Sequence, residues 1–122
     1  MRKRLQSFVY AGRGIRMVFS SEANMKIHLF IAVFVVMGGF IFRISVSEWI
    51  ACLLCIGLVF GMEMLNTALE HVVDLASPGH HQLAGKAKDA AAGAVLICAL
   101  ISVVVGVLIF TPKMWCLLQN LF

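Results

Sequence analysis

Four polar side chains recur at the spacing of one helix face: Glu63, Asn66, Glu70 and Asp74. Successive intervals of three and four residues stack side chains above one another along a helix. The preceding run, 49–62, carries no charge. A charged side chain inside a bilayer costs about 2.5–3.5 kcal/mol on insertion scales, so a purely structural helix would gain from leucine at position 63. We therefore interpret this face as functional, with interfacial ion pairs to nearby basic residues as the alternative.

Charged residues on two other segments complete a set suited to metal and phosphate. Lys86, Lys88 and Asp89 immediately precede the last apolar run, and Glu22 is the acid in an otherwise basic N-terminal segment. Taken alone, the two lysines only indicate topology, and Glu22 can be a first-turn acid beside a serine cap. Together with the carboxylates they indicate a phosphate and a divalent metal, because Mg²⁺ binds a few carboxylates plus phosphate oxygens.

The nucleotide-binding motifs of soluble kinases are missing from the sequence. Segment 79–86, Gly-His-His-Gln-Leu-Ala-Gly-Lys, has five residues between its glycines and an alanine after its lysine, so it fails the phosphate-loop pattern. There is no G-x-G-x-x-G, and His80-His81 lacks the spacing of a zinc-protease motif. Any phosphoryl transfer would therefore not use a soluble kinase fold.

Composition places the chain among membrane proteins. Its 122 residues suffice for one domain, and they are 61% hydrophobic and 13% charged, against about 45–50% and about 25% in soluble domains. A soluble globule this small could not cover so much apolar surface. The net charge of +4 adjoins bilayer-length apolar runs, so we expect anionic lipid and no nucleic acid as its partner. Cys52 and Cys55 lie inside an uncharged run and are interpreted as buried hydrophobic residues.

These features predict an all-α membrane protein with a single domain over residues 1–122. Residues 1–26 place most apolar side chains on one arc and basic ones on the other, as in a helix lying in the headgroup layer. Membrane helices are expected at about 27–44, 47–76 and 88–110. Eight of the ten basic residues fall on the N-terminal segment or the 75–89 connection, which predicts that both are cytoplasmic. Gly57 and Gly61 form a G-x-x-x-G that allows close helix packing, and so thin a bundle is expected to oligomerise.

At these residues the chain resembles the small prokaryotic diacylglycerol kinase family of integral membrane enzymes. Segment 63–74, Glu-x-x-Asn-Thr-Ala-x-Glu-x-x-x-Asp, is similar to the family's signature on its second membrane helix, and segment 85–95 to its second block. Glu22 and Tyr10-x-x-x-Gly14 stand at the expected distances upstream. The likeness runs from about residue 6 to 108. It implies a homotrimer in the inner membrane of a bacterium, with sites shared between protomers and facing the cytoplasm.

The resemblance also implies a role for each site residue. Glu63 would be the general base that takes the proton from a lipid hydroxyl. Glu22 and Glu70 would hold Mg²⁺ on the co-substrate ATP, and Asn66 would help to position the reacting groups. Lys88 would contact phosphate, and the nucleotide would be bordered by Tyr10, Asp74, His81 and Asp89. The implied reaction converts a membrane lipid alcohol, diacylglycerol or undecaprenol, into its monophosphate.

Two departures from the family pattern bear on the acceptor. Gly79-His80 replaces the Glu-Tyr pair of the proteobacterial branch, and segment 22–28 looks more like the branch that phosphorylates undecaprenol. We therefore favour a polyprenol slightly and leave both acceptors open.

A non-enzymatic ion-coupled transporter or proton relay is the alternative from another functional class, since acids within the membrane also mark ion paths. Such a relay needs polar groups through the whole bilayer depth. Apart from His28, the first span and residues 49–62 contain none, so the polarity lies at one end. That asymmetry favours catalysis at the interface, and a structural bundle without a site would leave the 63–74 face unexplained.

Overall fold

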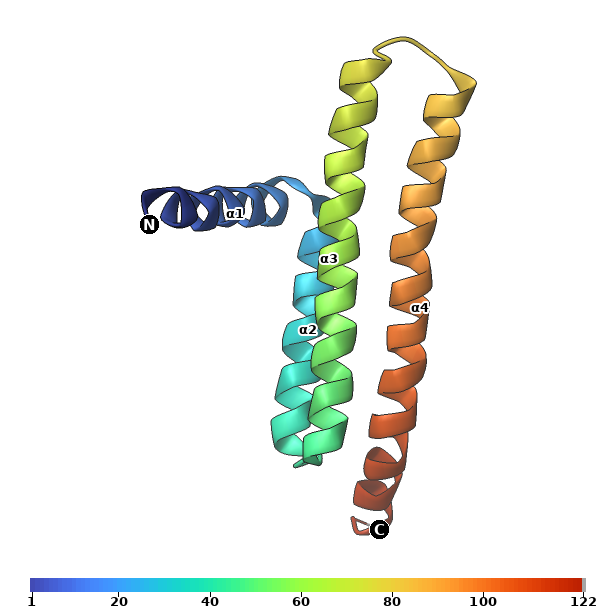
Figure 1. Ribbon diagram of the computed structural model, residues 1–122. Coiled ribbons are helices and arrows are strands. Elements are labelled where there is room, and N and C mark those ends of the chain that lie inside the picture. Colours follow the sequence, from blue (N-terminus) through green and yellow to red (C-terminus); the bar gives the residue numbers. More distant parts are fainter. Residues whose placement is uncertain (122) are drawn as a thin grey trace.

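The computed structural model describes residues 1–121, which form four α-helices (Figure 1). These are α1 (Arg2–Ser21), α2 (Ala23–Ile41), α3 (Val46–Ala76) and α4 (Gln82–Gln119). The last three are each long and apolar enough to cross a bilayer. The predicted all-α fold with three candidate spans is therefore confirmed for this part of the chain.

The long helix α3 is the axis of the molecule. α2 lies beside its lower half, and α4 packs along it with the most extensive contact in the chain (Figure 1). α1 projects sideways from the upper end of α2, and the last turns of α3 and the first turns of α4 extend beyond it (Figure 1). At about 1.5 Å per residue, the 31 residues of α3 span about 46 Å, well over a hydrocarbon core of about 30 Å. The excess length lies on the side of α1.

A corner at Glu22 separates α1 from α2. Its backbone is extended (φ −87°, ψ 121°), and its N–H donates to the Val18 carbonyl to close α1. Val18 and Met25 are buried on either side of the corner, and the Phe19 ring packs edge-on against that of Phe60 at 5.2 Å. The helix predicted to lie on the membrane surface therefore ends at residue 21 rather than 26, and the first candidate span begins at 23 rather than 27.

The other end of α2 is closed by a left-handed cap. Arg43 has φ 49°, its N–H donates to the Phe40 carbonyl, and the Ile44 N–H donates to the Gly39 carbonyl at 3.1 Å. This position usually holds glycine, and arginine there gives no stop signal in the sequence. The predicted end at 44 was therefore three residues too late, since α2 ends at Ile41.

A capping box starts α3 one residue before the predicted position. The Glu48 N–H donates to Ser45 Oγ at 3.2 Å, and the Ser45 N–H donates to Glu48 Oε2 at 2.7 Å. The same carboxylate accepts an ion pair from Lys113 Nζ of α4 at 3.1 Å. These contacts fix the lower end of α3 against α4.

The last helix is longer at both ends than the predicted 88–110. His81 caps its start, because the ring Nδ1 accepts a hydrogen bond from the Leu83 N–H at 3.1 Å. At the other end α4 passes through Pro112 and continues to Gln119. A proline removes one backbone hydrogen bond and usually bends or ends a helix. The predicted end at 110 marked only the end of the uncharged apolar run.

Candidate active site

The polar face of α3 runs from the interior of the bundle to its surface. Glu63 is 2% exposed and Asn66 is 8% exposed, whereas Glu70 is half-buried and Asp74 is exposed. The gradient arises because α2 covers only the lower part of α3, while the upper turns stand free of it (Figure 1). The four side chains therefore form one continuous strip that joins a buried site to the surface.

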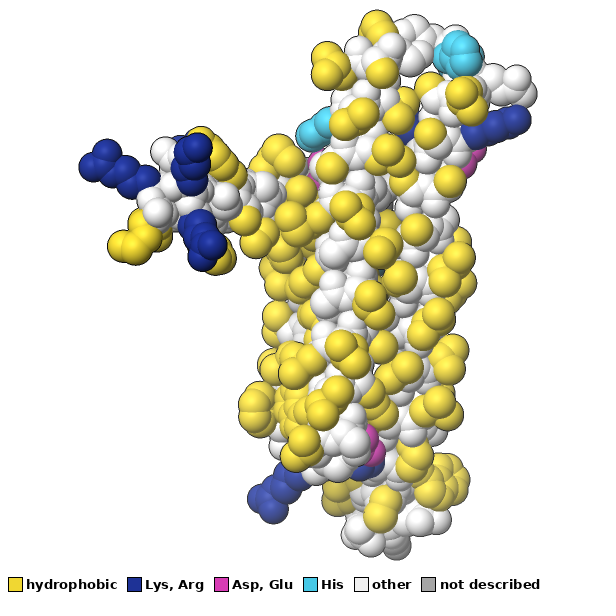
Figure 2. All heavy atoms as spheres, in the orientation of Figure 1, with side chains coloured by type: hydrophobic (Ala, Val, Ile, Leu, Met, Phe, Trp, Pro, Cys, Tyr) yellow, Lys and Arg dark blue, Asp and Glu magenta, His cyan; other side chains and the backbone are white. Residues whose placement is uncertain are grey.

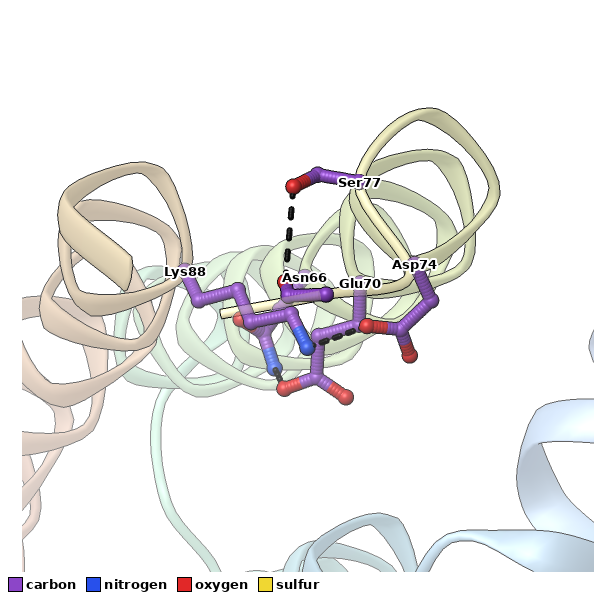
Figure 3. Close-up of polar contacts among 6 residues, drawn as sticks. Asn66, Glu70, Asp74, Ser77 and Lys88 are labelled. Carbon is purple, nitrogen blue, oxygen red and sulfur yellow. Dashed lines mark hydrogen bonds and ion pairs between the residues drawn. The ribbon is translucent and has the colours of Figure 1, made fainter. Parts of the chain in front are cut away.

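Two side-chain contacts organise this strip (Figure 3). Asn66 Nδ2 donates a hydrogen bond to Glu70 Oε1 at 3.3 Å, and Lys88 Nζ of α4 forms an ion pair with Asp74 Oδ1. The Lys88 and Asp74 side chains are 38% and 63% exposed, so solvent screens their attraction. Such a pair stabilises the fold little, and the phosphate contact of Lys88 stays a prediction.

The inner end of the strip holds two polar atoms without a partner. Glu63 Oε2 and Asn66 Oδ1 are buried and accept no hydrogen bond from any residue in the range 1–121. Thr67 Oγ1 donates at 3.0 Å to the backbone carbonyl of Glu63, not to its carboxylate. Buried polar groups in proteins are almost always paired, so such exceptions often mark a binding or catalytic site.

Glu63 and Asn66 line a cavity of about 240 Å³ between three helices. α2 contributes Asn24 and His28, which lie four residues apart on one helix face. α4 contributes the small and branched side chains Ala92, Val95, Leu96 and Ala99. Asn24 and His28 were not among the predicted site residues. Their signal in the sequence is a pair of polar side chains one turn apart at the start of an otherwise apolar span.

The predicted metal ligands lie on different segments, one at a corner between helices and one on α3. Glu22 forms the half-buried corner between α1 and α2, where Ser21 Oγ donates to its Oε1 at 3.3 Å, and Glu70 belongs to the strip on α3. Across residues 1–121, no three His, Cys, Asp or Glu side chains gather into a metal-binding group. The metal roles of Glu22 and Glu70 therefore stay predictions.

All four residues predicted to border a nucleotide lie outside the Glu63 cavity, and one of them, Asp74, is the surface end of the strip. Tyr10 is exposed on α1, with the Arg13 guanidinium 5.8 Å from its ring centre. His81 caps α4, and Asp89 is exposed on its second turn. Their nucleotide contacts stay predictions.

The family model described as prokaryotic diacylglycerol kinase matches residues 9–110 of this chain. The chain belongs to the prokaryotic diacylglycerol kinase family. The resemblance found in the sequence is thereby confirmed, and the chain is a lipid kinase rather than an ion-coupled transporter.

Relatives within this family carry two names. An undecaprenol kinase of Bacillus subtilis is 50% identical over 109 residues, which is 89% of each chain. A diacylglycerol kinase of Synechocystis is 40% identical over 111 residues, covering 90% of this chain and 63% of that protein. A diacylglycerol kinase of Escherichia coli K12 is 28% identical over 109 residues, covering 89% and 82%.

Proposed function

We propose that this kinase transfers the γ-phosphoryl group of ATP to the hydroxyl of a membrane lipid alcohol, with undecaprenol as the preferred acceptor. The observation that carries the proposal is the buried Glu63 carboxylate, which has an unpartnered oxygen in a cavity between the membrane helices. The identity of 50% to an undecaprenol kinase supports the polyprenol. The identity of 40% to a diacylglycerol kinase keeps diacylglycerol as the second acceptor.

Glu63 is the proposed general base. Its free Oε2 accepts the proton of the acceptor hydroxyl while the hydroxyl oxygen bonds to the γ-phosphorus. The bond from that phosphorus to the bridging oxygen breaks, and ADP leaves with the electron pair. A positioned base contributes about 10²–10⁴-fold to the rate of such a step. Asn66, held by its hydrogen bond to Glu70, would position the reacting groups through its own unpartnered oxygen.

The negative charge of the triphosphate needs cations close to the strip. Lys88 already lies opposite it, paired with an exposed carboxylate that a phosphate can replace. Glu22 and Glu70 would hold Mg²⁺, and two carboxylates suit an ion that takes its remaining ligands from phosphate and water. When bound, the ion would offset charge on the phosphate oxygens. The nucleotide would be bordered by Tyr10, Asp74, His81 and Asp89.

We also propose that three copies assemble, with each active site shared between protomers. A Cβ added at Gly57 or Gly61 would meet no atom within 4 Å, so the G-x-x-x-G face of α3 is uncovered in one protomer. Small residues on an open helix face allow close packing against a second helix in a membrane.

In the proposed orientation, the active site lies on the cytoplasmic side of the inner membrane of a bacterium. Figure 2 shows Lys and Arg side chains on α1 and at the upper end of the bundle, with fewer at the lower end. Basic residues near the ends of membrane helices favour the cytoplasmic side. Segment 63–74 of α3, which carries the polar strip, lies toward that same upper end (Figure 1).

A labelled transfer assay tests this function. Purified protein in mixed micelles receives γ-labelled ATP with undecaprenol and diacylglycerol offered side by side, with Mg²⁺ or with a chelator. We expect label in the lipid monophosphate, faster with undecaprenol and lost with the chelator. Absence of label from both lipids would reject the proposed reaction, and faster transfer to diacylglycerol would reject the acceptor preference.

A further inference from the structure

A second cavity, also of about 240 Å³, lies deeper between the same three helices. Its lining includes Ile31 and Val35 of α2, Val59 of α3 and Val103 of α4. One serine also lines it, and its hydroxyl is satisfied within α4, since Ser102 Oγ donates to the Cys98 carbonyl at 2.7 Å. The wall therefore offers hydrocarbon contacts and no free hydroxyl, which suits an apolar chain.

The two cavities meet at two residues. His28 of α2 and Ala99 of α4 line both of them. On α3, the first cavity contains Glu63 and the second reaches back through Val59 to Cys52. A difference of 11 residues is about 16 Å along a helix, so the second cavity extends toward the membrane interior from the buried carboxylate. A lipid alcohol that filled both cavities would therefore lie against His28.

His28 is the polar side chain at this junction. It is half-buried, and no hydrogen bond or ion pair found within residues 1–121 involves its ring. A neutral imidazole both donates and accepts hydrogen bonds. Glu63, whose Oε2 also lacks a partner, lines the first cavity together with His28, so that cavity offers two polar groups to the hydroxyl of an acceptor.

We propose that His28 is a positioning residue for the acceptor: the tail of the lipid alcohol occupies the second cavity, and His28 hydrogen-bonds its hydroxyl so that the proton points to Glu63. This inference rests on the proposed function. It assigns the acceptor specificity of that function to α2, a helix that supplied none of the predicted site residues. Ala99 faces the same junction and leaves room for the chain because its side chain is small.

Steady-state kinetics on the full protein test the role of His28. His28→Phe keeps an aromatic ring and removes the hydrogen bond, and we expect kcat/KM for undecaprenol to fall at least about tenfold. The KM for ATP should stay at the wild-type value, and His28→Gln, which can still donate and accept, should recover most of the loss. His71→Phe is the matched control, because His71 is exposed on α3 and lines neither cavity, and it should behave as wild type.

A second substitution tests the junction without touching the histidine. Ala99→Leu narrows the junction, so we expect the KM for undecaprenol to rise several-fold while transfer to a short-chain alcohol changes little. Ala90→Leu, on an exposed position of the same helix, should change neither. Size-exclusion chromatography of every variant checks assembly.

The outcomes separate this inference from the function on which it rests. Wild-type kinetics in His28→Phe, an equal loss in His71→Phe, or no recovery in His28→Gln would overturn the positioning role while lipid phosphorylation by the wild type stands. A wild-type protein that labels neither lipid would remove the proposed function and this inference together.

Discussion

The substitution Glu63→Gln should change catalytic turnover without disrupting the fold. Glutamine keeps the shape of glutamate, and the hydrogen bond from Thr67 Oγ1 survives because it goes to the backbone carbonyl of residue 63. The substitution therefore removes the charge and the capacity to take a proton, and little else. Turnover and stability should respond in different directions.

The expected magnitudes follow from burial and from the missing partner. Loss of a general base lowers kcat by about 10²–10⁴-fold, while the KM for ATP should change little. The Glu63 side chain is 2% exposed, and leaving one of its oxygens unpaired costs about 1–3 kcal/mol, more if it is charged. Removing the charge recovers part of this cost. The unfolding temperature of the variant should therefore equal or exceed that of the wild type.

The measurements are labelled transfer to undecaprenol and thermal unfolding, both in the same detergent. Glu48→Gln is the matched control, since Glu48 is the acid at the opposite end of α3. Glutamine still accepts the capping hydrogen bond there but loses the ion pair with Lys113, so turnover should be kept and the unfolding temperature should fall only slightly. Near-normal turnover in Glu63→Gln would refute its role as base, and marked unfolding would refute the reading of Glu63 as a destabilising group.

Three further substitutions probe the nucleotide, the packing and the assembly. Lys88→Met should raise the KM for ATP about 10- to 100-fold, because one charge-assisted hydrogen bond to phosphate is lost; an unchanged KM in steady-state kinetics would exclude that contact. Gly39→Ala should destabilise the bundle by about 1–3 kcal/mol in thermal unfolding, since its Cβ would lie 2.5 Å from the Trp49 ring, and adding Trp49→Leu should relieve the clash. Gly57→Leu should lower the mass measured by analytical ultracentrifugation in detergent, as the bulkier face separates the copies; a trimer of unchanged mass would show that this face is not the interface.

The sequence predicted well those features that belong to a single helix. Hydropathy and length placed α3 at 47–76, and the structure has it at 46–76. Its polar face was also predictable, because a spacing of three and four residues fixes which side chains share one side of a helix. The two ends of α2 were harder to predict from the sequence. One is set by the extended backbone of Glu22 and the other by Arg43 in a left-handed conformation that sequence patterns assign to glycine.

The sequence by itself determined that the chain is a bundle of apolar helices with a strip of polar side chains on α3. It also determined that the chain belongs to a family of lipid kinases. Only the tertiary structure decided that Glu63 is buried, that Lys88 pairs with Asp74, and that His28 lines two cavities. The spacing of residues fixes which side chains share one face of a helix. It does not fix how that helix is rotated, or how far it is shifted along its axis, relative to the neighbouring helices. Those are set by packing between helices, as at Met25 under the α1–α2 corner, and they determine which side chains from distant segments come together.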